Sequence, residues 1–188
     1  ASLERFRDIT GRNVLALQQA KEAGKKVVGQ YCIYSPLEIA LAAGAIPVSL
    51  CGTKNDSIPV AETMLPRSLC PLIKSSFGFA LQDSCPYLAA SDIVIADTTC
   101  DGKKKMFELL AERKPMFILQ LPQIQNEAAL AYWKKEFRRL TEELERRFEV
   151  TIGEAELRDA VYRANRFRRA LKGVLDLAKK KPSPLTGM

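Results

Sequence analysis

The chain has 188 residues, of which 47% are apolar, so it is long enough for one globular domain with a sizeable core. Its longest apolar stretch, residues 39–50, contains glycine and proline and is far shorter than the roughly 20 residues of a membrane-spanning helix. We therefore expect no membrane segment. The charged residues 1–13 do not resemble a secretory signal, so we expect a cytoplasmic, reducing location. There the five cysteines are expected to be thiols or metal ligands rather than disulfides.

The formal net charge of +7 lies entirely in the second half of the chain. Residues 1–100 balance nine Lys and Arg against nine Asp and Glu, and residues 101–188 hold the remaining twenty and thirteen. Many of these basic side chains fall in residues 163–181, where the simplest interpretation is a solvated helix face. An acidic protein partner or a phosphate-bearing substrate is the alternative. No aromatic-interleaved RNA motif or zinc-finger spacing is present, so we expect no nucleic-acid partner.

The first two thirds of the chain alternate between predicted helices and strands. An apolar pattern of helical period predicts a helix over residues 2–26, ended by Gly24. It is followed in chain order by a strand at 25–32, a helix at 35–45, a strand at 46–52, a polar loop at 53–66, a helix at 70–82, a strand at 91–97, a helix at 101–114 and a strand at 115–122. Ser35 and Asp101 are the predicted N-caps of their helices. This alternation is typical of an α/β fold with an open parallel sheet.

The last third is predicted to be helical. Apolar residues spaced three or four apart predict amphipathic helices over residues 126–149 and 153–179. We expect these to form a packed helical pair that covers or flanks the sheet.

The cysteines fall where a parallel sheet binds ligands, beyond the carboxyl ends of the strands. Cys32, Cys51 and Cys100 follow predicted strands, Cys70 opens a helix, and Cys85 lies in a loop before a strand. Cys51 has apolar neighbours and is the one that best fits simple core packing.

Cys100 has the most distinctive surroundings. It precedes a helix amino terminus and the lysines 103–105, and both features favour a thiolate, which is a nucleophile or a metal ligand. Cys70 precedes Pro71 and lies one helical turn from Lys74. The chain has no histidine, which excludes a Cys-His catalytic pair and zinc sites that need imidazole. An all-cysteine metal site or a set of separate thiols remains. Four-cysteine zinc sites usually show paired CxxC motifs, which are absent, whereas iron–sulfur clusters accept scattered cysteines.

Several long segments carry a family resemblance. They are "VVGQYCIYSPLEIALAAGAIPVSLCG", "LPRSLCPLIKSSFGFAL", "CPYLAASDIVIADTTCDGKKKMFELLAE" and "ILQLP". Together they resemble the amino-terminal domain of the 2-hydroxyacyl-CoA dehydratase and benzoyl-CoA reductase subunit family, and most closely its double-cubane cluster branch. The similarity extends from about residue 29 to the tail.

The resemblance implies a flavodoxin-like domain that shares an oxygen-sensitive iron–sulfur cluster with a second α/β domain. An ATP-hydrolysing activator protein would supply single low-potential electrons to a 4Fe-4S or double-cubane cluster. Dehydratase members use them to reduce a 2-hydroxyacyl-CoA thioester to a ketyl radical and expel hydroxide, and double-cubane members reduce small molecules. A homologous subunit or a dimer would complete the assembly.

The resemblance also assigns roles to residues of this chain. Cys70 of "CPLIKSS" and Cys100 of "TTCDGKKK" match cluster ligands, Cys32 matches a further cysteine of the double-cubane branch, and Cys85 is a weaker candidate. Asp101 would cap a helix, and Lys103 to Lys105 would offset cluster charge, although solvated lysines are the simpler interpretation for at least two of the three. Ser75 and Ser76 would hydrogen-bond cluster sulfur or substrate, or pack the helix. The basic carboxyl-terminal helix would receive the activator or a CoA phosphate.

Family members are about twice as long as this chain. We therefore interpret the chain as an amino-terminal helix (1–25), an α/β cluster-binding domain (26–125), a helical pair (126–179) and a linker (180–188) cut before a second domain. Two classes of function follow, which are a component of an ATP-dependent reductase or dehydratase and a non-catalytic metal-binding or structural half-domain.

Overall fold

The computed structural model describes residues 8–184, and the predicted helix residues 1–7 and linker residues 185–188 lie outside that part. Four parallel strands form one sheet in the order β2-β1-β3-β4. Their bounds are Val27–Gln30 for β1, Ile46–Ser49 for β2, Ile93–Asp97 for β3 and Met116–Leu119 for β4. The flavodoxin-like α/β fold predicted from the alternation of elements is therefore confirmed.

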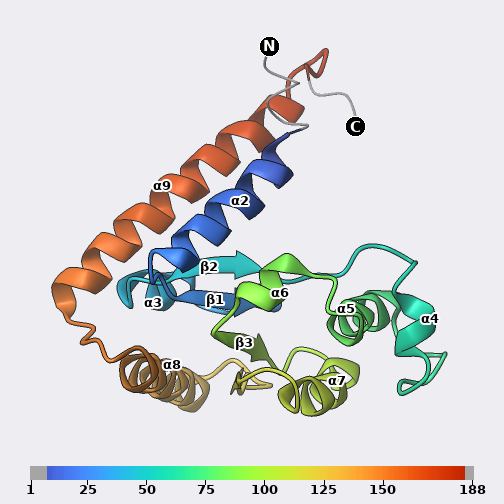
Figure 1. Ribbon diagram of the computed structural model, residues 1–188. Coiled ribbons are helices and arrows are strands. Elements are labelled where there is room, and N and C mark those ends of the chain that lie inside the picture. The colour runs from blue at the N-terminus through green and yellow to red at the C-terminus, as the bar shows by residue number, and fades with distance from the viewer. Residues whose placement is uncertain (1–7, 185–188) are drawn as a thin grey trace.

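Helices cover both faces of this sheet. Their bounds are Ile9–Glu22 for α2, Leu37–Ala42 for α3, Ile58–Ala61 for α4, Pro71–Leu81 for α5, Pro86–Ala90 for α6, Asp101–Ala111 for α7, Glu127–Phe148 for α8 and Glu154–Ala178 for α9. One core cluster joins the sheet to α3, α8 and α9, and a second joins it to α4, α5, α6 and α7. Figure 1 shows the strands between the two groups. Because both faces are covered, the strands read as continuous apolar runs, and every residue of β3 is buried.

The connections that leave β1 and β3 go to opposite faces. The chain passes from β1 into α3, which belongs to the first core cluster, and from β3 into α7, which belongs to the second. The two strands are neighbours, with Gly29 opposite Val94. Divergent connections at adjacent parallel strands open a crevice at their carboxyl ends, the usual ligand position in such sheets.

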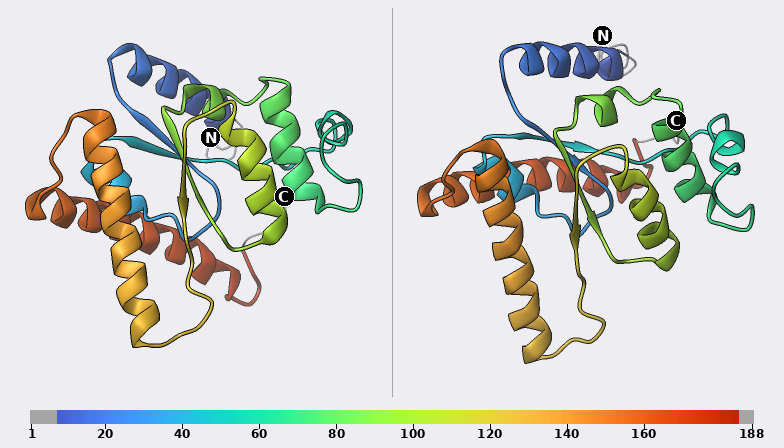
Figure 2. Two further views of the ribbon diagram at one scale, coloured as in Figure 1. Left: turned by 90° about the horizontal axis from the view of Figure 1, so that it is seen from below. Right: turned by 60° about the horizontal axis from the view of Figure 1, so that its bottom comes forward.

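The long carboxyl-terminal helices are confirmed, but they pack differently from a helix pair. α8 lies against β4 and α3, and α9 lies mainly along α3. Ala160 and Ala164 of α9 are buried, whereas none of its residues after Ala164 is. The far half of α9 therefore extends beyond the sheet, in the same direction as α2 in Figure 1, and Figure 2 shows the sheet between these two helices. In this basic helix, Arg168 forms an ion pair with Glu38 at 2.5 Å.

Both predicted N-caps are wrong by one residue. Pro36 occupies the N-cap position of α3, and the Ser35 hydroxyl accepts a hydrogen bond from the Gln30 side-chain amide at 3.0 Å. Cys100 caps α7, and Asp101 is the first helical residue, with its exposed carboxylate 3.0 Å from the Lys104 ammonium. The sequence analysis also missed α4 and α6, two helices of four and five residues that lie in predicted loops.

The amino-terminal helix is tied to the sheet by one carboxylate. Asp92 accepts hydrogen bonds at 2.7 Å from both the Lys21 ammonium of α2 and the backbone N–H of Val27, the first residue of β1. Gly24 ends this region with a φ of 80°, a left-handed conformation that favours glycine. Among the described residues, no helix is long and apolar enough to cross a membrane.

Glu136 of α8 is a buried carboxylate that holds the end of β4. It accepts hydrogen bonds from the Gln120 N–H at 2.8 Å and from the Arg139 guanidinium, also at 2.8 Å. Burial alone would raise the pKa of Glu136, but the bonds from Arg139 and Gln120 outweigh it and lower that pKa. The charged form is therefore favoured in the folded state.

We expect Glu136→Gln to lower the free energy of unfolding at pH 7 by about 2 kcal/mol, the usual range for hydrogen bonds to a charged group. Because the pKa of Glu136 is lower in the folded state, its charged form stabilises the fold above the unfolded carboxyl pKa of about 4.3. That stability is lost as the pH falls through the lower pKa of the folded state. The difference between the variant and the parent should thus shrink below about pH 4 in urea titrations. Glu142→Gln, on the exposed face of α8, should change stability by less than about 0.5 kcal/mol.

Candidate cysteine site at the carboxyl edge of the sheet

Cys32 and Cys100 flank the crevice at the carboxyl ends of β1 and β3. Cys32 follows β1 with a φ of 69°, a left-handed conformation that is uncommon outside glycine. Its sulfur lies 3.8 Å from the Thr99 hydroxyl, on the turn that carries Cys100, and in hydrogen-bonding contact with the Lys103 ammonium of α7. The crevice therefore brings together the turns of two of the predicted site cysteines.

Lys103 is the one predicted lysine that faces the site. Partial burial by itself lowers the pKa of Lys103, but the contact with Cys32 and the charges of Asp97 and Cys51 outweigh it, so that pKa is raised. Lys103 thus remains a cation beside the sulfur. The side chains of Lys104 and Lys105 instead form exposed ion pairs within α7, at 3.0 Å from Asp101 and Glu108, which confirms the solvated interpretation for two of the three.

Asp97 is a site residue that the sequence analysis missed. Its side chain is fully buried at the end of β3. One carboxylate oxygen accepts hydrogen bonds from the Thr99 hydroxyl at 2.7 Å and the Thr99 N–H at 3.3 Å, and the other accepts one from the Tyr34 N–H at 3.4 Å. Asp97 therefore contacts the turn of Cys100 and the loop of Cys32 together. Asp97 could have been identified from the sequence, because it is a single carboxylate at the end of an otherwise apolar strand.

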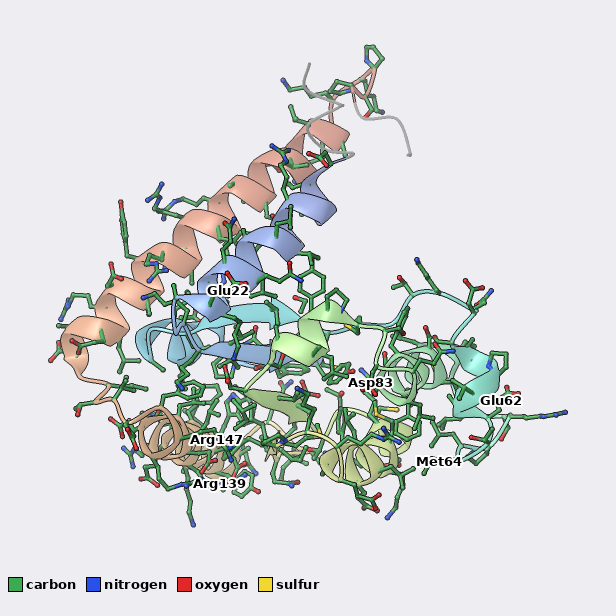
Figure 3. The ribbon with its side chains drawn as sticks, viewed as in Figure 1. Glu22, Glu62, Met64, Asp83, Arg139 and Arg147 are labelled. Carbon is green, nitrogen blue, oxygen red and sulfur yellow. The ribbon has the colours of Figure 1, made fainter. Side chains whose placement is uncertain are left out.

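Cys70 is exposed and caps the amino end of α5. The segment before it is anchored by Lys74, whose buried ammonium donates at 2.7 Å to the Arg67 carbonyl and pairs at 2.7 Å with Glu62. Glu62 lies at the end of α4 (Figure 3). Lys74 therefore neutralises Glu62 and positions the loop, and the sulfur of Cys70 is not among its contacts.

The amino ends of α5 and α7 approach each other closely. A side-chain carbon placed on Gly102 would lie 2.7 Å from a methyl carbon of Leu69, so a larger residue there would require the Leu69 side chain to shift. Leu69 precedes Cys70, and Gly102 is two residues after Cys100. This close approach brings the turn of Cys70 beside that of Cys100.

Cys85 and Cys51 line a separate cavity of about 340 Å³. The Cys85 sulfur caps α6 by accepting the Leu88 N–H at 3.4 Å. Cys51 is exposed, so the prediction that it packs in the core is wrong. It directly follows Leu50, which is 2% exposed, and the chain turns out of the sheet between the two. Tyr31 lines the same cavity, and burial, followed by the charges of Cys85 and Cys51, holds the pKa of its hydroxyl well above the usual range.

Ser75 and Ser76 are buried on α5 and bonded to backbone groups. The Ser76 hydroxyl donates to the Leu72 carbonyl at 2.9 Å and accepts the Gly52 N–H at 2.9 Å, and the Ser75 hydroxyl donates to the Lys54 carbonyl at 2.6 Å. Both hydroxyl protons are thus used inside the protein. This geometry supports the packing alternative, in which the two serines hold the loop after β2 against α5.

The described residues contain no group of three or more Cys, Asp or Glu side chains arranged to hold a metal ion. The four predicted ligands are distributed, with Cys32, Cys70 and Cys100 on neighbouring turns at one edge and Cys85 in the adjacent cavity. Cys70 and Cys100 occupy the N-cap positions of two eleven-residue helices, and the sulfur of Cys32 contacts the Lys103 ammonium. This donor set fits the chemistry of an iron–sulfur cluster, because such clusters are held by thiolates.

Comparison with known proteins places the chain in a family. Residues 32–188 match the family "2-hydroxyglutaryl-CoA dehydratase, D-component". The chain is 47% identical over its full length to the Escherichia coli (strain K12) protein named "Putative dehydratase subunit YjiM", and the match covers 49% of that protein. It is 29% identical over 170 residues to the lactoyl-CoA dehydratase subunit beta of Anaerotignum propionicum, which covers 88% of this chain and 45% of that protein.

A third relative is the (R)-phenyllactyl-CoA dehydratase beta subunit of Clostridium sporogenes, 26% identical over 174 residues, with 90% of this chain and 46% of that protein covered. The chain therefore spans about half the length of these relatives. The family match includes all five cysteines and both turns of the crevice. The resemblance found in the sequence is confirmed, and the chain belongs to the 2-hydroxyacyl-CoA dehydratase family.

Proposed function

We propose that the chain is the iron–sulfur half of a cytoplasmic, oxygen-sensitive dehydratase or low-potential reductase subunit. The observation that carries this proposal is the crevice between β1 and β3, where the sulfur of Cys32 contacts Lys103 beside the turn of Cys100. The family match and the names of its dehydratase relatives support it. The substrate would be a 2-hydroxyacyl-CoA thioester or a small reducible molecule.

Cys32, Cys70 and Cys100 would hold the cluster, and Cys85 is the weaker fourth candidate. A 4Fe-4S or double-cubane cluster supplies one-electron transfer at low potential when bound. The helix amino termini behind Cys70 and Cys100 would stabilise negative charge on the sulfurs, and the Lys103 ammonium would do the same beside Cys32. Asp97 would hold the turn of Cys100 and the loop of Cys32 in fixed positions relative to each other.

Partners follow from the same proposal. The exposed cysteines lie at an open edge of the sheet, and the relatives are about twice as long as this chain. A second α/β domain or a homologous subunit would therefore supply the remaining ligands and close the site, in a dimeric assembly. An ATP-hydrolysing activator would deliver the electrons.

The second candidate function is a metal-binding or structural half-domain without catalysis of its own. It is favoured by one observation, which is that the chain spans about half the length of its relatives. In this case the partner domain would carry the reaction.

Anaerobic reconstitution with iron and sulfide separates the two candidates. The chain should be tested alone and together with the segment that corresponds to the other half of the relatives. A brown protein with about four or more iron atoms per chain and a spectrum that bleaches on reduction supports the redox function. A colourless protein in both forms would exclude it and leave the structural role.

We expect Asp97→Asn to weaken iron binding in such a reconstitution by about 10- to 100-fold, the usual cost of losing an outer hydrogen-bond partner of a metal site. The amide would place a donor where the carboxylate now accepts from Thr99 or Tyr34. Iron titration followed by visible absorbance measures the change. Asp56→Asn, at an exposed position of the loop after β2, is the matched control and should bind iron as the parent does.

A further inference from the structure

The hydroxyl of Tyr31 has no hydrogen-bond partner among the described residues, although only 5% of this residue is exposed. Its backbone N–H continues the pairing of β1 with β3 by donating to the Ile95 carbonyl at 2.9 Å, so the residue is fixed in place. Its ring packs against Phe107 with the centroids 5.7 Å apart. The hydroxyl of Tyr31 is therefore free to donate a hydrogen bond to a ligand or a water that reaches it.

Tyr31 is among the residues that line the cavity of about 340 Å³, together with Cys51 and Cys85. In the described part of the chain, every side-chain nitrogen or oxygen that is fully sealed from solvent has a partner. The Tyr31 oxygen is therefore accessible to solvent, and the cavity is one space that Tyr31 borders. Both thiols lie near enough to interact electrostatically with the hydroxyl.

Hydrogen bonds and close packing within the protein hold the walls of the cavity in place. The loop after β2 forms one wall, and the hydroxyls of Ser75 and Ser76 fix it to α5 through Lys54 and Gly52. A side-chain carbon on Gly52 would lie 2.4 Å from the Ser76 nitrogen, so the loop packs directly on the helix. The remaining walls are mostly apolar, with Leu50, Phe79 and Leu88 among them.

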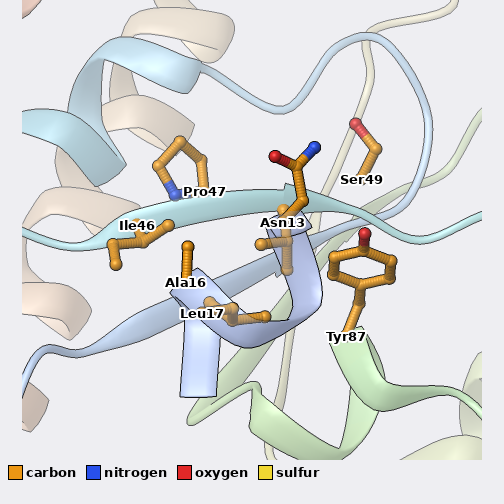
Figure 4. A pocket seen from close by; sticks show the side chains of 8 residues that line it. Asn13, Ala16, Leu17, Ile46, Pro47, Ser49 and Tyr87 are labelled. Carbon is orange, nitrogen blue, oxygen red and sulfur yellow. The ribbon is translucent and has the colours of Figure 1, made fainter. Parts of the chain in front are cut away.

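A neighbouring cavity differs from the Tyr31 cavity because no buried polar side chain lines it. It measures about 550 Å³, lies between α2 and β2, and shares Tyr87 with the first cavity (Figure 4). Of the residues that line it, only Leu17 is buried, and that side chain is apolar. It therefore presents no buried polar group that needs a ligand.

We propose that the Tyr31 cavity binds a small molecule with an apolar body and a neutral carbonyl group, whose oxygen accepts the hydrogen bond of the Tyr31 hydroxyl. Apolar walls with one placed donor are typical of ligand pockets, and a volume near the lower end of their range admits only a small ligand. An amide or ester fits better than a carboxylate, because the lysine among the lining residues, Lys54, is exposed to solvent and no buried cation offsets a negative charge in the cavity. Cys32, Cys70 and Cys100, the three main cluster candidates, are not among the residues that line the cavity, whereas Cys85, the weaker candidate, is.

Fluorine NMR on the reduced, metal-free protein tests the proposal with 4-fluorobenzamide as the probe. We expect Tyr31→Phe, which removes only the hydroxyl, to weaken binding of this amide about tenfold. Fluorobenzene, which has no acceptor, should bind equally to parent and variant, and 4-fluorobenzoate should bind more weakly than the amide. Tyr162→Phe, at an exposed position of α9, is the matched control and should have no effect.

Equal binding of the amide to the parent and to Tyr31→Phe would overturn the proposal, as would a parent protein that binds none of the probes at millimolar concentration. A second measurement needs no variant. Bound 4-fluorobenzamide should slow alkylation of Cys51 and Cys85 by N-ethylmaleimide several-fold, detected by mass spectrometry of peptides, and leave Cys100 unaffected. Unchanged rates at all three cysteines would refute the site even if Tyr31→Phe fails to fold.

Discussion

Replacement of Cys100 by serine is expected to abolish iron binding, with a loss of affinity of about a hundredfold or more. Loss of a metal ligand should cost at least as much affinity as loss of an outer hydrogen-bond partner, which costs about 10- to 100-fold. Serine keeps the size and the helix-capping position but lacks the soft thiolate that iron–sulfur clusters require. Cys32→Ser and Cys70→Ser should behave in the same way, because the three cysteines lie on neighbouring turns.

Cys51→Ser is the matched control for this series. Cys51 is an exposed cysteine in the same sheet edge, but it lines the Tyr31 cavity and is not a proposed ligand. Anaerobic iron and sulfide analysis should find the parent content in this variant. Retention of iron in Cys100→Ser, or equal loss in Cys51→Ser, would reject the assignment. Cys85→Ser shows whether the weaker candidate belongs to the set.

Replacement of Gly78 by alanine is expected to lower the free energy of unfolding by about 3 kcal/mol or more, at the upper end of overpacking costs. Gly78 lies in α5 against Ser57, the N-cap of α4. A side-chain carbon at this position would lie 1.9 Å from the Ser57 carbonyl oxygen and 2.6 Å from its carbonyl carbon. These are backbone atoms, so α4 and α5 would have to move apart.

Thermal unfolding measures this effect, and the midpoint should fall by about 6–12 °C at the usual 2–4 °C per kcal/mol for a chain of this size. Gly173→Ala is the control. Gly173 lies in the projecting half of α9 with no atom near a new side-chain carbon. Alanine should stabilise this helix by up to about 1 kcal/mol. Equal effects of the two substitutions would show that α5 does not pack on Ser57 as described.

The local pattern of residues was sufficient to predict the sheet and its long helices. The apolar run that contains β3 and the periodic run that contains α8 were both located within a few residues, because each element is apolar on the faces it buries. The short helices α4 and α6 were missed, since four or five residues carry too little periodicity for recognition. Both N-caps differ from the prediction by one residue: the Ser35 hydroxyl bonds to Gln30, and the Asp101 carboxylate pairs with Lys104.

The sequence by itself determined the alternation of strands and helices, the family, and the cysteines and lysines that follow the strands. Tertiary structure alone decided which of these residues meet. Lys103 reaches Cys32, 71 positions away, because β1 and β3 are neighbours whose connections leave on opposite faces. The same packing exposed Cys51, buried Asp97 at the end of β3, and placed Tyr31 in the wall of a cavity. Such contacts depend on strand order, which periodicity along a single chain does not encode.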